Sequence, residues 1–198
     1  MRSVLHSFEF PLWLRACVVL AGLGALTSGT RSLAHTLETS YCRIHATAEG
    51  VVISIAFDFS TLGWIAAPDA DEDGLVTSEE LYAVARPMEN FLQRTLAIRQ
   101  NGRELILGSM LPLEWPARAH PVISADEFHR HFAIFRFRIS HPAAAEPVEL
   151  SIGYFKDLGK NHTVLGTIAT NGREERLIFT ENNSVRTFTP VHFTRAME

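Results

Sequence analysis

The sequence predicts a mainly β fold, an antiparallel β-sandwich of the immunoglobulin-like kind, with one loop-and-helix insertion. Short segments in which apolar and polar residues alternate recur along the chain, as is typical of half-buried strands. Two Asn-Gly pairs, Asn101-Gly102 and Asn171-Gly172, separate such segments, and Asn-Gly favours the tight turn of a hairpin. With 198 residues, 46% of them hydrophobic and 20% charged, the chain can bury a core and is not globally disordered.

Residues 1–34 are expected to form a signal peptide. The segment 16–30 carries no charge. It is too short to span a bilayer, which takes about 20 residues, but it has the length of a signal-peptide core. Ser32 and Ala34 are small residues suited to cleavage before His35, which would release the protein into the periplasm or the medium. The alternative is an uncleaved segment that tethers the protein to a membrane.

The domain itself is expected over residues 35–190, followed by a C-terminal tail at 191–198. The expected strands, in chain order, lie at 40–48, 51–59, 95–99, 104–107, 131–139, 148–154, 164–170 and 175–180. Residues from Asn182 onward show no strong pattern. Cys42 lies in the first of these strands, where we expect it to be a small buried apolar residue.

An insertion is expected at residues 60–94, and its second half has helical spacing. Apolar residues recur on one face of the segment 77–94, namely Leu81, Val84, Ala85, Met88 and Leu92. Pro87 lies inside this run, so we expect it to kink the helix or divide it near Arg86.

Directly before this helix, residues 69–80 match the calcium loop of an EF-hand at every diagnostic position. Asp at positions 1, 3 and 5, Gly74 at position 6 and Glu at position 12 follow the EF-hand pattern, in which alternate carboxylates converge on one cation. Position 7 contributes its backbone carbonyl, and position 9 binds directly or through water. The expected Ca²⁺ ligands are Asp69, Asp71, Asp73, Leu75 (backbone), Thr77 and Glu80.

The surroundings of this loop differ from those of a complete EF-hand. Residues 59–68 leave room for two helical turns at most before the loop, and the sequence contains one such loop where EF-hands usually pair. We therefore expect a loop grafted into another fold, with a structural role and an affinity in the extracellular range, about 10⁻⁴ to 10⁻³ M. The alternative is an acidic surface turn in front of a helix N-terminus, where carboxylates are favoured anyway.

A late segment adds a second motif, of the form aromatic-x-Asp-Leu-x-x-x-His. It comprises Phe155, Asp157, Leu158 and His162, and is followed by Val164-Leu165-Gly166. Together with the His35 start, two strands and the acidic loop, this order resembles the exported N-terminal domain of bacterial HupE/UreJ-type membrane proteins. Members of that family continue into hydrophobic helices associated with nickel or cobalt handling. No such helices follow in this sequence, so the resemblance implies the exported domain, standing alone or cut off from its membrane half, and the transport function is not carried over.

Other constellations in the sequence are weaker. His129 and His131 share one face of an extended segment, and with His162, His120 or His35 they could bind a transition metal. We expect ordinary hydrogen-bonded or exposed histidines instead, because no third ligand is set by spacing. The sequence contains none of the common nucleophile, phosphate-loop or zinc-protease motifs, so we expect no catalytic residues and no enzyme activity. A net charge of −4 argues against a nucleic-acid partner.

We therefore expect an exported, non-enzymatic structural or binding module that holds Ca²⁺ in a single EF-hand-type loop. A membrane permease or another envelope protein is the expected partner. The alternative is a periplasmic accessory domain that handles nickel or cobalt, and a hydrolase is a third hypothesis.

Overall fold

The computed structural model describes residues 39–47, 50–117, 120–139, 146–170 and 173–190. The chain divides into two units, Met1–His35 and Thr36–Glu198, and all described residues belong to the second. The expected signal peptide, the C-terminal tail and the Asn171-Gly172 turn lie outside the described residues. In the described part of the chain, no helix is both long enough and apolar enough to cross a bilayer.

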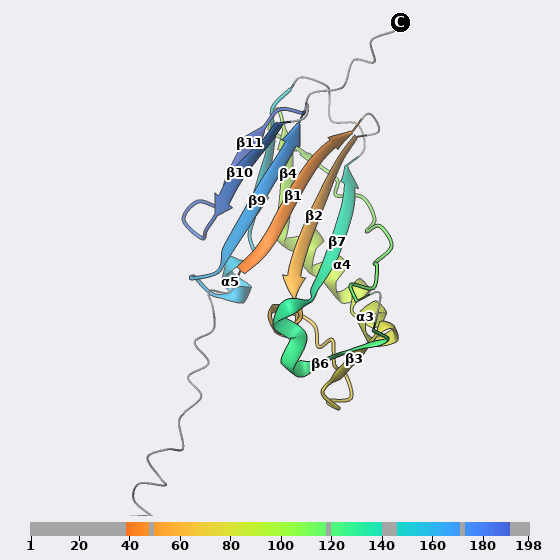
Figure 1. The fold of residues 1–198 in the computed structure, drawn as a ribbon. Coiled ribbons are helices and arrows are strands. Elements are labelled where there is room, and N and C mark those ends of the chain that lie inside the picture. The colour runs from red at the N-terminus through yellow and green to blue at the C-terminus, as the bar shows by residue number, and fades with distance from the viewer. Residues whose placement is uncertain (1–38, 48–49, 118–119, 140–145, 171–172, 191–198) are drawn as a thin grey trace, which may run out of the picture. The chain divides into compact units, whose positions relative to one another are not determined.

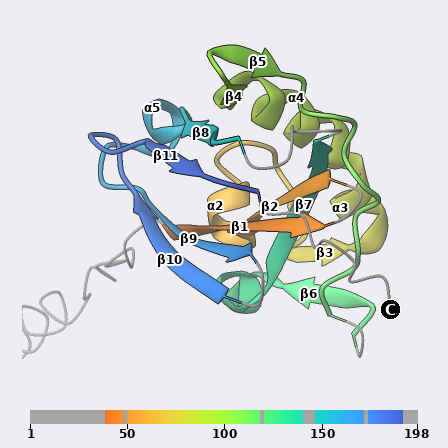
Figure 2. The same cartoon turned by 90° about the horizontal axis from the view of Figure 1, so that it is seen from above.

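Two larger sheets make the protein mainly β, as predicted. The first has five strands in the order β10-β9-β1-β2-β7, and the second has four in the order β11-β8-β4-β5 (Figures 1 and 2). The strands of the first are β10 (Arg173–Phe179), β9 (Thr163–Thr170), β1 (Thr39–Thr47), β2 (Gly50–Asp58) and β7 (Phe132–Ile139). Those of the second are β11 (Val185–Phe188), β8 (Val148–Ile152), β4 (Leu96–Gln100) and β5 (Arg103–Leu105).

One pairing departs from the antiparallel arrangement that the hairpin signals predict. Strands β1 and β9 run parallel, with Tyr41 opposite Leu165 and Cys42 opposite Gly166. Hairpin turns specify only the pairing of neighbouring strands, and β1 and β9 are separated by most of the domain. The sequence signals therefore contain no information on this contact.

Alternation along the strands buries one face of each sheet in a single hydrophobic core. Alternate residues of β7 (Ala133, Phe135, Phe137 and Ile139) are buried, and the intervening arginines, Arg136 and Arg138, face away from the core. The largest fully buried side chains include Tyr154 and five phenylalanines, at positions 57, 59, 135, 137 and 179. Cys42 is buried with a free thiol, as predicted, and burial raises its pKa to about 12. This thiol is consequently unreactive.

The Asn101-Gly102 hairpin forms as predicted between β4 and β5. Asn101 has φ 52° and Gly102 has φ 73°, both in the left-handed region that a type I′ turn requires. Gln100 pairs with Arg103 on either side of the turn.

The insertion follows β2 and precedes β4. It contains the short helix α2 (Phe59–Leu62), the strand β3 (Leu75–Thr77) and the helices α3 (Ser78–Ala83) and α4 (Ala85–Thr95). The expected helix is divided, at Val84. Pro87 lies in the first turn of α4, where a backbone N–H would have no partner in the helix and proline is tolerated.

Five elements were not expected from the sequence. They are β3, β6 (Val122–Ser124), the 3₁₀ helix η1 (Ala125–Arg130), the short helix α5 (Phe155–Leu158) and β11. Strand β11 lies in the segment after Asn182, for which the sequence shows no strong pattern. It is held by pairing with β8, and of its four residues only Phe188 is buried, so it has little hydrophobic pattern to detect.

Candidate functional site

The acidic loop brings its three aspartates together. Each of Asp69, Asp71 and Asp73 offers one carboxylate oxygen, and these oxygens all lie within 4.8 Å of one another. Asp69 is partly buried, and the other two are exposed. Three like charges so close repel one another unless a cation lies between them. In the described residues this is the one group of three or more acidic, His or Cys side chains close enough to hold a metal ion.

Backbone amides of the loop keep the aspartates in place. Gly74 N donates to Asp69 Oδ2 at 3.0 Å, and Leu75 N donates to Asp73 Oδ1 at 2.8 Å. Asp73 N donates to Asp71 Oδ1 at 3.3 Å. Gly74 adopts φ 82°, which a side chain would disfavour, so the position 6 glycine has the role that the loop pattern predicts.

Asp69 also carries an unsatisfied acceptor. Its second oxygen, Oδ1, is buried and has no hydrogen-bond partner in the described part of the chain. An unpaired buried carboxylate oxygen costs free energy, and a bound cation would remove this cost. At loop position 1, both the residue type and the local environment of Asp69 are therefore suited to binding a metal ion.

The last two predicted ligands, Thr77 and Glu80, form a capping box at the start of α3. Glu80 N donates to Thr77 Oγ1 at 3.3 Å, while Thr77 N donates to Glu80 Oε2 at 2.9 Å. Glu80 Oε1 also accepts from Ala70 N at 3.1 Å and so ties the beginning of the loop to its end. These hydrogen bonds, that from the Thr77 backbone foremost, lower the pKa of the Glu80 carboxyl below its ordinary value.

Glu80 is thus ionised and at the loop, but its carboxylate is not part of the aspartate group. The predicted ligand set is brought together in part: three aspartates converge, while Thr77 and Glu80 bind each other. Leu75, the predicted backbone ligand, is the first residue of β3.

A strand from elsewhere in the chain supports the loop. Strand β3 pairs with β6, so that Val76, at loop position 8, lies opposite Ile123, and both side chains are buried. Ala125 N donates to Gly74 O at 2.8 Å, which continues the contact past the strand. In Figure 1, β3 and β6 lie side by side near the end of the first sheet where β2 stops. Sequence reasoning missed β6, whose three residues are too short to show a period.

The entering side of the loop is short, as predicted. Helix α2 has four residues, capped by Asp58 Oδ1, which accepts from Thr61 N at 2.7 Å. Phe59 and Leu62 anchor it in the core. The loop therefore starts from a fixed point at the end of β2, although it has no long entering helix.

The histidines that could bind a transition metal do not gather in the described residues. His162 is buried, whereas His129 and His120 are exposed, and His129 accepts from Arg130 Nε at 3.3 Å. His131 is partly exposed at the start of β7. His35 lies outside the described residues.

His162 belongs to a buried polar cluster that sequence reasoning missed. Ser40 Oγ lies 3.0 Å from the Tyr154 hydroxyl and 3.0 Å from His162 Nε2, so it bridges the two rings. Burial lowers the pKa of His162 to about 4 and raises that of Tyr154 above its ordinary value. Both are therefore neutral at physiological pH, and the cluster joins β1 to the segment around α5.

No protein-family model matches the chain, and no curated protein sequence is significantly similar to it.

Proposed function

We propose that this protein is an exported calcium-binding module in which a single EF-hand-type loop holds one Ca²⁺. The observation that carries the proposal is the convergence of the Asp69, Asp71 and Asp73 carboxylates around a buried Asp69 oxygen that lacks a hydrogen-bond partner. The Leu75 carbonyl, Thr77 and Glu80 complete the proposed ligand set. A bound Ca²⁺ would offset the mutual repulsion of these negatively charged carboxylates.

The chemistry of the donors favours calcium over nickel or cobalt. All proposed ligands are oxygen atoms of carboxylates, a carbonyl and a hydroxyl, and these suit Ca²⁺. Imidazole is the ligand that suits nickel, and the described histidines are dispersed. The alternative of a nickel- or cobalt-handling accessory domain is therefore the second candidate, and it is tested below alongside calcium.

The rest of the proposal concerns the fold and the setting. We propose that the two sheets form an immunoglobulin-like β-sandwich, which their common buried core supports. The relation to the exported domain of HupE/UreJ-type proteins is supported by the order of strands, acidic loop, helix and late Asp-Leu-x-x-x-His segment. In that setting the partner would be a membrane permease or another envelope protein, and the calcium site would stabilise the domain without catalysing a reaction.

Calorimetry and melting curves of the purified protein test the calcium site. We expect a Kd of about 10⁻⁴ to 10⁻³ M, because the entering helix is short and the hand is single. Calcium at ten times Kd should then raise the free energy of unfolding by about 1.4 kcal/mol. Glu80→Gln should lose this gain yet keep its stability in chelator, because glutamine also serves in a capping box. Glu79→Gln, next to it in the first turn of α3 and exposed, is the matched control and should behave as wild type.

Three further arms distinguish the alternatives. Asp69→Asn should also abolish the calcium response, and magnesium should replace calcium poorly because it requires near-ideal octahedral geometry. If Glu80→Gln and wild type melt identically across millimolar calcium, the loop is only an acidic turn. A response to nickel that His129→Gln and His131→Gln remove, without a response to calcium, would favour the accessory domain.

A further inference from the structure

A groove lies on the outer face of the five-stranded sheet, on the opposite side from the core. It has a volume of about 740 Å³, within the range of small-molecule sites. The floor comes from β1, β2, β7 and β9, and one wall is the segment Glu114–Trp115–Pro116. None of the proposed calcium ligands lines it, so this groove is independent of the proposed function.

Strand register places an apolar row across the sheet, part of which forms the floor of the groove. Paired neighbours run directly from β10 to β7, as Ile178, Leu165, Tyr41, Ala56 and Ile134. The four large members are exposed, from 40% for Leu165 to 54% for Ile178. Four large exposed apolar side chains in one continuous line are unlike the isolated apolar residues common on protein surfaces.

The next row of the same face, two residues along each strand, is polar and cationic. It runs Arg176, Thr167, Arg43, Ser54 and Arg136 across the same five strands. All of these except Arg176 line the groove, and its arginines are Arg43, Arg136 and, from η1, Arg130. Among the described lining residues these three arginines face a single carboxylate, Glu114, although the whole chain has a net charge of −4.

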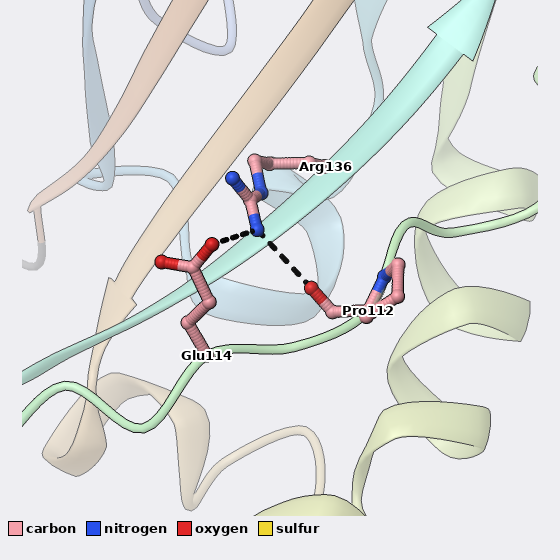
Figure 3. Close-up of polar contacts among 3 residues, drawn as sticks. All are labelled: Pro112, Glu114 and Arg136. Atoms are coloured by element: carbon pink, nitrogen blue, oxygen red, sulfur yellow. Dashed lines mark hydrogen bonds and ion pairs between the residues drawn. The ribbon is translucent and has the colours of Figure 1, made fainter.

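Hydrogen bonds fix the wall of the groove over this floor. Arg136 Nη2 donates to Glu114 Oε1 at 2.7 Å and to Pro112 O at 3.2 Å, as Figure 3 shows. Trp115 Nε1 donates to the carbonyls of Ala117 and His120 at 2.9 and 2.8 Å, which holds its ring at the groove. The groove is therefore built by specific contacts.

From these two rows we propose that the groove binds an organic carboxylate with a flat apolar body. The apolar body would lie along Leu165, Tyr41 and Ile134, next to the rings of Trp115 and Phe132. The carboxylate would face Arg43 and the edge of the cationic row. Arg43 Nη2 donates to Glu174 Oε1 at 3.0 Å, and both of these side chains are exposed. A guanidinium has five N–H donors, so this contact leaves other donors of Arg43 for the carboxylate of a ligand.

The negative charge of the carboxylate should make this ligand class bind more tightly than its neutral analogues. A neutral amide of the same shape would use the apolar row, but its carbonyl would accept only a weaker hydrogen bond from the arginines than a carboxylate does. Because Arg43 is exposed, a charge-assisted hydrogen bond there favours the anion by about tenfold at most.

The test compares 2-naphthoate with 2-naphthamide, which share one apolar body and differ in charge. Calorimetry and two-dimensional NMR of the purified protein should show saturable naphthoate binding, with shifts in residues of β1, β7 and β9. We expect the amide to bind about tenfold more weakly. Arg43→Gln should weaken naphthoate by about tenfold and affect the amide much less.

Arg99→Gln is the matched control, because Arg99 is an exposed arginine paired with one glutamate, Glu149, on the other sheet. It should bind naphthoate as wild type does. Leu165→Glu, which places a negative charge on the apolar row, should abolish binding of both compounds, whereas Ile106→Glu, at an exposed position outside the groove, should not.

Three results would overturn the proposal. They are the absence of saturable naphthoate binding, equal binding of acid and amide, and equal effects of Arg43→Gln and Arg99→Gln. A concentration-dependent dimer that Leu165→Glu dissociates in sedimentation experiments would also overturn it, by assigning this face to a second copy of the chain.

Discussion

Thr77 and Glu80 have two tasks at one place, because the residues that cap α3 are also proposed calcium ligands. The spacing of an EF-hand loop predicts the positions of the ligands, since it acts within a few residues. It does not predict that the Glu80 carboxylate accepts from Thr77 and Ala70, because capping and coordination use the same oxygens.

The double role of Thr77 leads to a prediction at this residue. Thr77→Ala should lower the free energy of unfolding by about 1 kcal/mol in chelator, because the N-cap is lost. It should also weaken calcium binding. Thr77→Ser keeps the hydroxyl and should restore both properties. Urea denaturation with and without calcium measures the two effects, and an unchanged stability of Thr77→Ala in chelator would show that the cap contributes nothing.

His162 illustrates a residue whose role the sequence conceals. Its hydrogen-bond partner Ser40 lies 122 positions away, so no local pattern connects them. The histidine of the Asp-Leu-x-x-x-His motif is thereby buried and neutral, and its contact with Ser40 links β1 to the α5 segment.

The buried imidazole predicts a pH dependence of stability. Its pKa is lowered from 6.5 to about 4 in the folded state, so between these values the unfolded chain binds a proton that the folded chain does not. The free energy of unfolding should therefore fall as pH decreases from 6.5 to 4, by an amount of the order of 3 kcal/mol at the lower limit. Denaturation across this range measures it. His162→Gln should flatten the slope, whereas His131→Gln, on the partly exposed His131, should keep it.

At the scale of elements, long alternating strands and the Asn101-Gly102 hairpin were predictable, and short supporting elements were not. The β3–β6 pair is the clearest case, because three residues in each strand give no period, yet β6 pairs with the end of the acidic loop. The isolated loop expected from the sequence is thus held by another part of its own chain.

This pairing predicts that a residue without a ligand atom controls calcium affinity. Ile123→Ala removes the buried partner of Val76 and should lower the free energy of unfolding by about 2 to 4 kcal/mol. It should also weaken calcium binding several-fold, because the loop loses its support. Ile152→Ala, a fully buried isoleucine in β8, should cost similar stability without changing affinity. Calorimetry on the folded protein measures the calcium affinity of each variant. Equal affinities of Ile123→Ala and wild type would show that β6 does not support the site.

For the whole molecule, composition and alternation predicted a mainly β domain with an insertion between the second strand and β4. They could not predict which strands meet across the sheets. The parallel contact of β1 with β9 and the addition of β11 to β8 depend on backbone pairing between distant segments, which leaves little trace in local sequence.

The proposed export of the whole molecule can be measured directly. The mature chain should begin near His35, because the apolar segment 16–30 is too short to remain in a bilayer. Intact mass spectrometry of the protein from the periplasm or medium should give the mass of the shortened chain. Recovery of the full-length mass in the membrane fraction would instead support an uncleaved tether.

The parallel contact between β1 and β9 also constrains the order in which the chain can fold. During synthesis β1 and β2 emerge first and can pair at once, whereas Leu165, the other neighbour of Tyr41, emerges only after most of the domain. Until then one edge of β1 is open, and open strand edges promote aggregation. Contacts of such long sequence separation slow folding, typically to milliseconds or seconds. Nascent chains that end before β9 should therefore be the form of this protein that most needs a chaperone.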